Sequence, residues 1–158
     1  MKTLQNWLDE YGESHQNPTN KAVHWICVPA IFFSVVGLIW SIPFPDFLEW
    51  KVMGQELNWA FIALSLVFLY YLTLSFSLSV GLFLFGALCL AGNSYLDGLE
   101  LMPLWGISLI IFAVAWVGQF WGHKIEGKKP SFFKDIQFLM IGPAWLMHFI
   151  YKKIGIPY

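Results

Sequence analysis

The stretch from Trp59 to Tyr95 contains no charged residue, and it limits the possible folds of this chain more than any other feature. A helix rises about 1.5 Å per residue and a membrane span needs about 20 apolar residues, so the stretch is too long for one span. We expect two spans joined by a tight turn near Ser75–Gly81. Only 12% of the chain is charged, against roughly 25% in soluble domains, which also indicates an integral membrane protein.

Two further apolar stretches, residues 22–43 and 101–121, are long enough to span a membrane. A last apolar segment, residues 136–151, is shorter and is interrupted by Gly142 and Pro143, so we expect an interfacial or re-entrant helix there. The predicted fold is an all-α integral membrane protein with four transmembrane helices and a C-terminal interfacial or re-entrant helix. It forms a single domain over all 158 residues.

Lysine placement predicts the orientation of these spans, because short cytoplasmic loops carry an excess of positive charge. Only Lys51 lies between the first and second spans, whereas six lysines lie before the first span or between the fourth span and the terminal apolar segment. Both termini are therefore expected in the cytoplasm. The short chain, with lysine as its only strong cation, favours a bacterial inner membrane, or the endoplasmic reticulum in a eukaryote. The six lysines are Lys2, Lys21, Lys124, Lys128, Lys129 and Lys134.

The sequence excludes several classes of partner and function. A net charge of −1 gives no basic surface for nucleic acid. Cys27 and Cys89 lie in apolar stretches outside any C-x-x-C motif, so free thiols are expected. No ionisable residue lies in the middle of a span, which disfavours a transporter. The first 21 residues are polar, so no cleavable signal peptide is expected, and no pattern indicates an oligomeric state.

All four histidines lie toward the predicted cytoplasmic side. His15 and His24 flank the start of the first span, His123 follows the fourth, and His148 lies in the terminal segment. Neutral imidazole is the commonest side-chain metal ligand, so all four could converge on one ion. The alternative is a set of amphipathic interfacial histidines without a metal. Four histidines without an H-x-x-H-H box exclude the membrane di-iron class, and they leave zinc hydrolysis and iron–dioxygen chemistry both open.

Polar residues near these histidines are candidates for the reaction. Gln119 and Glu126 lie four residues before and three after His123, so a helix puts each on the His123 face. Glu126 could ligate a metal, orient a ligand or act as a base, or it could be a solvated anion. Asn20 is placed to cap the first span, with a hydrogen bond to substrate or to a ligand histidine as the alternative. Aromatic residues near the boundary are interpreted as an interfacial belt: Trp7, Tyr11, Trp25, Trp121 and Trp145.

Two segments resemble the membrane family of 2-hydroxy fatty acid dioxygenases: YGESHQNPTNKAVHWICVPA and, after intervening spans, WVGQFWGHKIEGKKPSFFKDIQFLMIGPAWL. The first carries an H-x(4)-N-x(3)-H pattern and the second a Q-x(2)-G-H motif followed by Glu and Pro. The resemblance covers nearly the whole chain, and the two motifs together are much more specific than either alone. The residues of the two motifs are His15, Asn20 and His24, then Gln119, Gly122, His123, Glu126 and Pro130.

The resemblance implies an Fe(2+)-dependent α-oxidation, in which a 2-hydroxy fatty acid and O2 give a fatty acid one carbon shorter. Eukaryotic members of the family act in the breakdown of phytosphingosine to odd-numbered fatty acids. Three of the histidines match those of the family, and with the fourth they form the candidate metal ligands: His15, His24, His123 and His148. The catalytic candidates are Glu126, Asn20 and Gln119.

The expected substrate is compatible with a site at a membrane boundary. An α-hydroxy acid can chelate iron through its carboxylate and hydroxyl oxygens, while its chain lies among apolar helices and membrane lipid. Lys21, Lys124 or Lys128 could attract the carboxylate, or could serve only as topology signals. Two other functions stay open at this point: a non-catalytic small membrane scaffold or lipid-binding protein, and a metal-dependent lipid hydrolase.

Overall fold

The computed structural model describes residues 2–45, 47, 51–52, 55–127 and 138–158, and these residues are mainly helical. The only sheet within them is an antiparallel pair of two-residue strands, β1 (Lys51–Val52) and β2 (Gln55–Glu56). Their six helices are α1 (Leu4–Gly12), α2 (Pro18–Trp40), α3 (Trp59–Leu74), α4 (Phe76–Gly98), α5 (Leu104–Glu126) and α7 (Ile141–Ile154).

Three helices in the described residues, α2, α4 and α5, are long and apolar enough to cross a membrane, at 23 residues each. The fourth predicted span, α3, is also apolar but has only 16 residues, which correspond to about 24 Å of helix against a hydrocarbon core of roughly 30 Å. The predicted helical fold is therefore confirmed, with three candidate spans. Four transmembrane helices stay a prediction.

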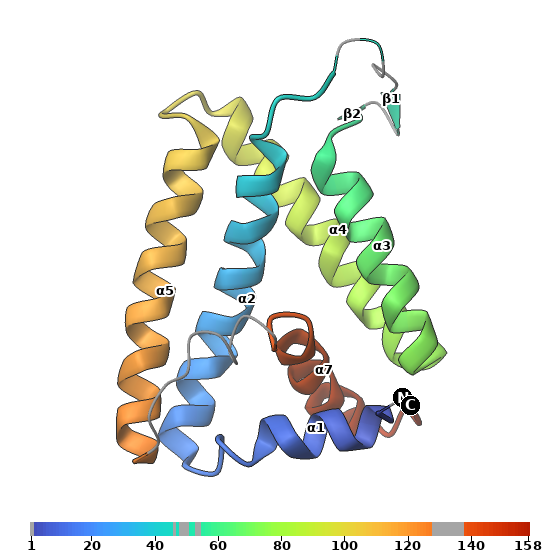
Figure 1. Cartoon of the computed structure of the whole chain (residues 1–158), viewed down its shortest axis with the longest axis vertical. Coiled ribbons are helices and arrows are strands. Elements are labelled where there is room, and N and C mark those ends of the chain that lie inside the picture. The colour runs from blue at the N-terminus through green and yellow to red at the C-terminus, as the bar shows by residue number, and fades with distance from the viewer. Residues whose placement is uncertain (1, 46, 48–50, 53–54, 128–137) are drawn as a thin grey trace.

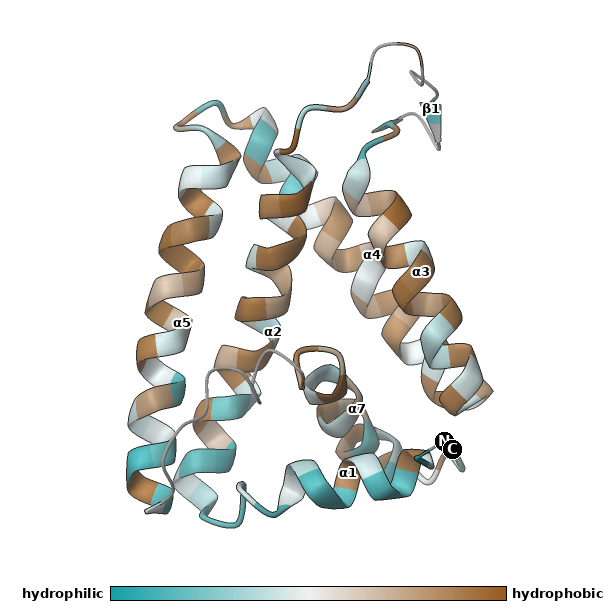
Figure 2. Ribbon diagram, viewed as in Figure 1, coloured by the Kyte–Doolittle hydropathy of each residue, from teal (hydrophilic) through white to brown (hydrophobic). Residues whose placement is uncertain are grey.

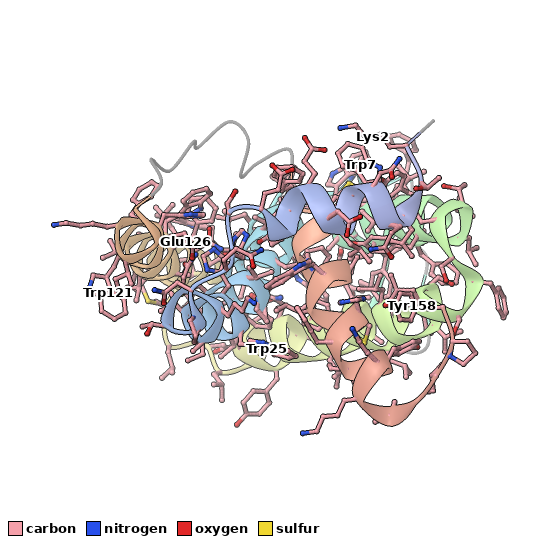
Figure 3. The ribbon with its side chains drawn as sticks, turned by 90° about the horizontal axis from the view of Figure 1, so that it is seen from below. Lys2, Trp7, Trp25, Trp121, Glu126 and Tyr158 are labelled. Carbon is pink, nitrogen blue, oxygen red and sulfur yellow. The ribbon has the colours of Figure 1, made fainter. Side chains whose placement is uncertain are left out.

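The long helices run side by side and two short helices lie across one end of them (Figure 1). α2 packs along α5, and α3 and α4 form a hairpin that also contacts α2. α1 and α7 pack against each other at the end where both chain termini lie, and Figure 3 shows them crossing beneath the longer helices. The arrangement brings the start of α2, the end of α5 and both short helices into one region.

The outer surfaces of the long helices suit a lipid environment. Large apolar side chains are exposed along them, as at Leu88 on α4 and Val117 on α5. Figure 2 shows apolar residues along α3, α4 and α5, while polar residues gather on α1 and at the neighbouring ends of α2 and α5. The protein is therefore a membrane protein by the character of its helices, with a polar end formed around α1.

The turn between α3 and α4 confirms the predicted hairpin. α3 ends at Leu74 and α4 begins at Phe76, so Ser75 alone separates them. The Ser75 hydroxyl accepts a hydrogen bond from the Leu78 amide at 3.2 Å and thereby caps α4. The break falls within the predicted stretch because serine satisfies a free amide at the helix start.

Two predictions about helix ends are wrong. Asn20 is not the cap of α2: the helix begins at Pro18, and the Asn17 side chain accepts from the Thr19 amide at 2.9 Å. Proline is favoured at the first helical position because its missing N–H would be unpaired there anyway. Gly142 and Pro143 do not interrupt the last segment but lie in the first turn of α7, where proline is tolerated. Residues 136 and 137 of that predicted segment lie outside the described residues.

Candidate metal centre

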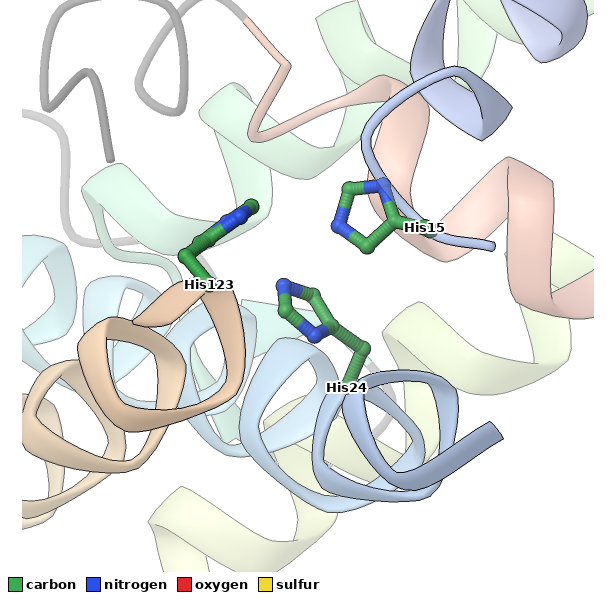
Figure 4. Close-up of side chains that lie close together, drawn as sticks. All are labelled: His15, His24 and His123. Atoms are coloured by element: carbon green, nitrogen blue, oxygen red, sulfur yellow. The ribbon is translucent and has the colours of Figure 1, made fainter. Parts of the chain in front are cut away.

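Three histidines meet at the polar end of the bundle, each from a different element. His15 lies between α1 and α2, His24 lies in α2, and His123 lies near the end of α5. One ring nitrogen of each lies within 4.8 Å of the others, and all three side chains are at most 3% exposed. Figure 4 shows the three rings gathered around a common point. The predicted convergence of these three histidines is present in the structure.

Backbone carbonyls orient two of the three rings. His15 Nδ1 lies 2.6 Å from the Tyr11 carbonyl and His24 Nδ1 lies 2.9 Å from the Asn20 carbonyl. Because a carbonyl oxygen only accepts, both Nδ1 atoms must carry the proton, and each Nε2 then has a free lone pair. His15 Nε2 is buried and has no hydrogen-bond partner among the described residues. Metal-ligating histidines are commonly held in this tautomer by such a carbonyl.

The environment of His15 keeps its ring neutral at physiological pH. Burial lowers the pKa of His15 from 6.5 to about 4, because the protein interior disfavours the charged imidazolium. The hydrogen bond to Tyr11 raises the pKa, but by less than burial lowers it, and His123 nearby lowers it further. A neutral ring can bind a metal ion without first losing a proton, so the site is ready for a cation at pH 7.

Aromatic rings hold His15 although it lies outside a helix. The Tyr11 ring stacks on His15 with centroids 4.3 Å apart and planes 4° apart, and Trp145 of α7 lies 5.3 Å away. Tyr11 and Trp145 are buried, so the prediction that they belong to an interfacial belt is wrong, whereas Trp25 and Trp121 are exposed. Figure 3 shows Trp121 at the outer edge of the molecule. Because His15 lies beyond the end of α1, its helical spacing from Tyr11 did not by itself predict this contact.

Glu126 fastens the segment that carries His15 to the end of α5. Its Oε1 accepts from the Gln16 amide at 2.9 Å, and its Oε2 accepts from the Asn17 amide at 2.8 Å and from the Asn20 side chain at 3.1 Å. α5 ends directly after Glu126 because Gly127 adopts a left-handed φ of 73°. These three bonds, called the Glu126 clamp below, hold the backbone that follows His15. A role for Glu126 as a metal ligand, as an orienting group for a ligand or as a base stays a prediction.

Asn20 is the second buried component of the clamp. Its side chain is fully buried, and its amide donates to the Ser14 carbonyl at 3.1 Å as well as to Glu126. A Cβ atom at position 122 would lie 2.4 Å from Asn20 Oδ1, so α5 needs glycine there to approach Asn20. The Asn20 and Gly122 motif positions therefore meet at the contact between α2 and α5, directly beside the histidines.

The other predicted site residues lie around the three histidines without joining them. Gln119 is buried on α5, one helical turn before His123. His148 lies on α7, where its Nδ1 pairs with the Tyr158 hydroxyl, and a ligand role for it stays a prediction. A crevice of about 250 Å³ between α1 and α7 is lined by His148, His15 and Lys21. Lys128, a candidate for attracting the carboxylate, and Pro130, a motif position, both lie outside the described residues.

The donor set fits a first-row metal ion. Three neutral imidazoles suit zinc and iron alike, and three protein ligands leave coordination positions open for exogenous molecules. The unpartnered, buried Nε2 of His15 is a group that such an ion would satisfy. The three histidines therefore form a candidate metal site at the polar end of an apolar bundle.

Comparison with known proteins gives one match. A family whose description is 2-hydroxy-palmitic acid dioxygenase Mpo1-like matches residues 1–154, a range that includes all three histidines and the Glu126 clamp. No curated protein matches the chain, and no solved structure does.

Proposed function

The chain belongs to the Mpo1-like family of 2-hydroxy-palmitic acid dioxygenases, and on this basis we propose that it is an Fe(2+)-dependent dioxygenase of 2-hydroxy fatty acids. The proposed reaction is an α-oxidation in which the fatty acid and O2 give a fatty acid one carbon shorter. The observation that carries the proposal is the group of three buried histidines, two of them with Nδ1 committed to a carbonyl and Nε2 left for a metal. The family supplies the substrate class, which the histidines alone do not specify.

Each element of the site has a part in this proposal. His15, His24 and His123 would hold the iron. When bound, Fe(2+) supplies open coordination positions for the two oxygens of an α-hydroxy acid and for dioxygen. Tyr11 and Trp145 cover the His15 ring and exclude water from that side. The Glu126 clamp fixes the backbone on either side of Gln16, which places His15 opposite α2 and α5.

The reaction is tested with purified, iron-loaded protein. We expect 2-hydroxypalmitate to give the fifteen-carbon acid in air and no product under nitrogen, as followed by mass spectrometry. Palmitate is the matched control: it has the same length but one oxygen donor fewer for the metal, so it should react poorly. No product in air, with iron confirmed bound, would contradict the proposal. Oxygen-independent lipid hydrolysis by zinc-loaded protein would favour the hydrolase instead.

We further propose that α3 is the fourth span and that both termini lie in the cytoplasm of a bacterium. The hairpin of α3 and α4 and the position of both termini at one end support an even number of crossings. Reporter fusions at the N-terminus and after Tyr158 should read cytoplasmic, and a fusion after Glu100 should read on the opposite side. Opposite readings for the two termini would rule out this topology and a site shared by α1 and α7.

A further inference from the structure

A small cavity lies beside the three histidines and is separate from the space between their rings. It has a volume of about 20 Å³, enough for about one water molecule, and residues of α1, α2, α5 and α7 line it. Tyr11, which stacks on His15, forms part of its wall, and so does Gln119, one turn before His123 on α5. The cavity therefore borders two residues that adjoin candidate metal ligands.

The Gln119 side chain has no partner in the part of the chain that the structure describes. It is only 6% exposed, and it lines the cavity. Two other buried amides are paired through their nitrogen atoms only: Asn20 donates to Ser14 and Glu126, and Asn93 donates to the Phe33 and Cys89 carbonyls, while Oδ1 of each has no partner among the described residues. The Gln119 amide is not among the fully buried atoms of the described residues that lack a partner, so it borders accessible space, where a polar group in the cavity can pair with it.

Glycine keeps this space open from the side of α7. A Cβ atom at position 142 would lie 2.9 Å from Val28 Cγ1 and 3.2 Å from the Tyr11 hydroxyl oxygen, and Val28 and Tyr11 both line the cavity. α7 therefore reaches the cavity wall only because residue 142 has no side chain. α7 therefore forms one side of a water-sized space that Gln119 borders.

We propose that Gln119 determines specificity for the 2-hydroxyl group of the fatty acid by hydrogen bonding to that group in this cavity. The inference rests on the proposed function, because it assigns a binding group to the same substrate. A hydroxyl both donates and accepts, and a glutamine amide offers two donors and an acceptor, so the two are complementary. The cavity admits a group of that size, whereas a carboxylate is too large for it. In the free protein a water molecule offers the same groups.

The test compares the binding of two acids to the full-length protein. The proteins are wild type, Gln119→Leu, which removes both donor and acceptor at similar volume, and Gln5→Leu, a matched change at an exposed position of α1. Binding of 2-hydroxypalmitate and palmitate is measured by isothermal titration under nitrogen, with iron-loaded and metal-free protein. In metal-free protein, where iron contributes nothing to binding of the hydroxyl, we expect Gln119→Leu to weaken binding of the hydroxy acid by roughly tenfold or more and to leave palmitate binding nearly unchanged.

Each other outcome has a defined meaning. Equal loss of both acids in Gln119→Leu, or an unchanged preference for the hydroxy acid, would overturn the role of Gln119 while leaving the proposed function standing. A preference that exists only in iron-loaded protein would assign hydroxyl recognition to the metal, which also overturns it. If wild type binds neither acid, the proposed function itself fails. Iron content and thermal melting check that Gln119→Leu is folded, and Gln119→Met serves if it is not.

Discussion

Replacing His15, His24 or His123 by alanine should remove iron from the protein and reduce turnover to background. Each substitution removes one of three nitrogen donors from the site. Removal of a group that only hydrogen-bonds to a ligand lowers metal affinity roughly 10- to 100-fold, and we expect removal of a ligand itself to lower it further. We expect about one iron per chain in wild type and almost none in the three variants, as measured by elemental analysis of purified protein.

His148→Ala is the matched control for these variants. Its side chain pairs with Tyr158 and lies outside the group of three, so this variant should keep most of the iron. Full iron occupancy in the alanine variant of His15, His24 or His123 would show that the ligand assignment is wrong. Wild type that carries no stoichiometric metal would favour the non-catalytic scaffold. His→Gln variants, which fill more of the space, separate loss of metal from loss of folding.

Gly122→Ala should destabilise the protein and weaken iron binding together. The new Cβ would lie 2.4 Å from Asn20 Oδ1, and Asn20 is fully buried, so either the clamp must shift or α2 and α5 must separate. Overpacking of this kind costs about 1–3 kcal/mol. We expect a lower midpoint of thermal unfolding and a higher dissociation constant for iron, because the clamp positions the segment of His15.

Gly98→Ala provides the control for that change. A Cβ atom at position 98 meets nothing within 4 Å, and the residue lies at the end of α4, far along the chain from the clamp. This variant should melt near wild type and bind iron normally. If Gly122→Ala behaves like Gly98→Ala, the close contact between α5 and Asn20 does not determine the geometry of the site.

The sequence predicts helices well here because membrane spans require long apolar stretches, and these are visible without knowledge of packing. The same argument predicts a turn within residues 75–81, because the apolar run is too long for one span, and the Ser75 cap fixes the position of that turn. The start of α2 was placed four residues late, since hydropathy does not register the cap at Asn17 or the proline that follows it. Helix ends depend on single capping side chains, and the length of an apolar stretch does not show where those side chains lie.

The grouping of three candidate metal ligands was predictable from the sequence, whereas the contacts that hold them in place were less so. Topology alone placed His15, His24 and His123 at one end, and the structure brings them together. The partners of Glu126 are backbone amides far away in the sequence, so its spacing from His123 pointed to the wrong neighbour. The position of His148 depends on how α7 packs, with Ala144 and Trp145 buried, and no local pattern specifies that packing.

The Glu126 clamp also imposes an order on biosynthesis. Gln16 and Glu126 are 110 residues apart in the chain, so a nascent protein makes α1 and the His15 segment long before their partner exists. At synthesis rates of about 5–20 residues per second, the interval is roughly 5–20 s. During that interval His15 and His24 have been synthesised but His123 has not. The three imidazoles can therefore meet only after α5 has been synthesised, and on the proposed function we expect metal loading to follow that step.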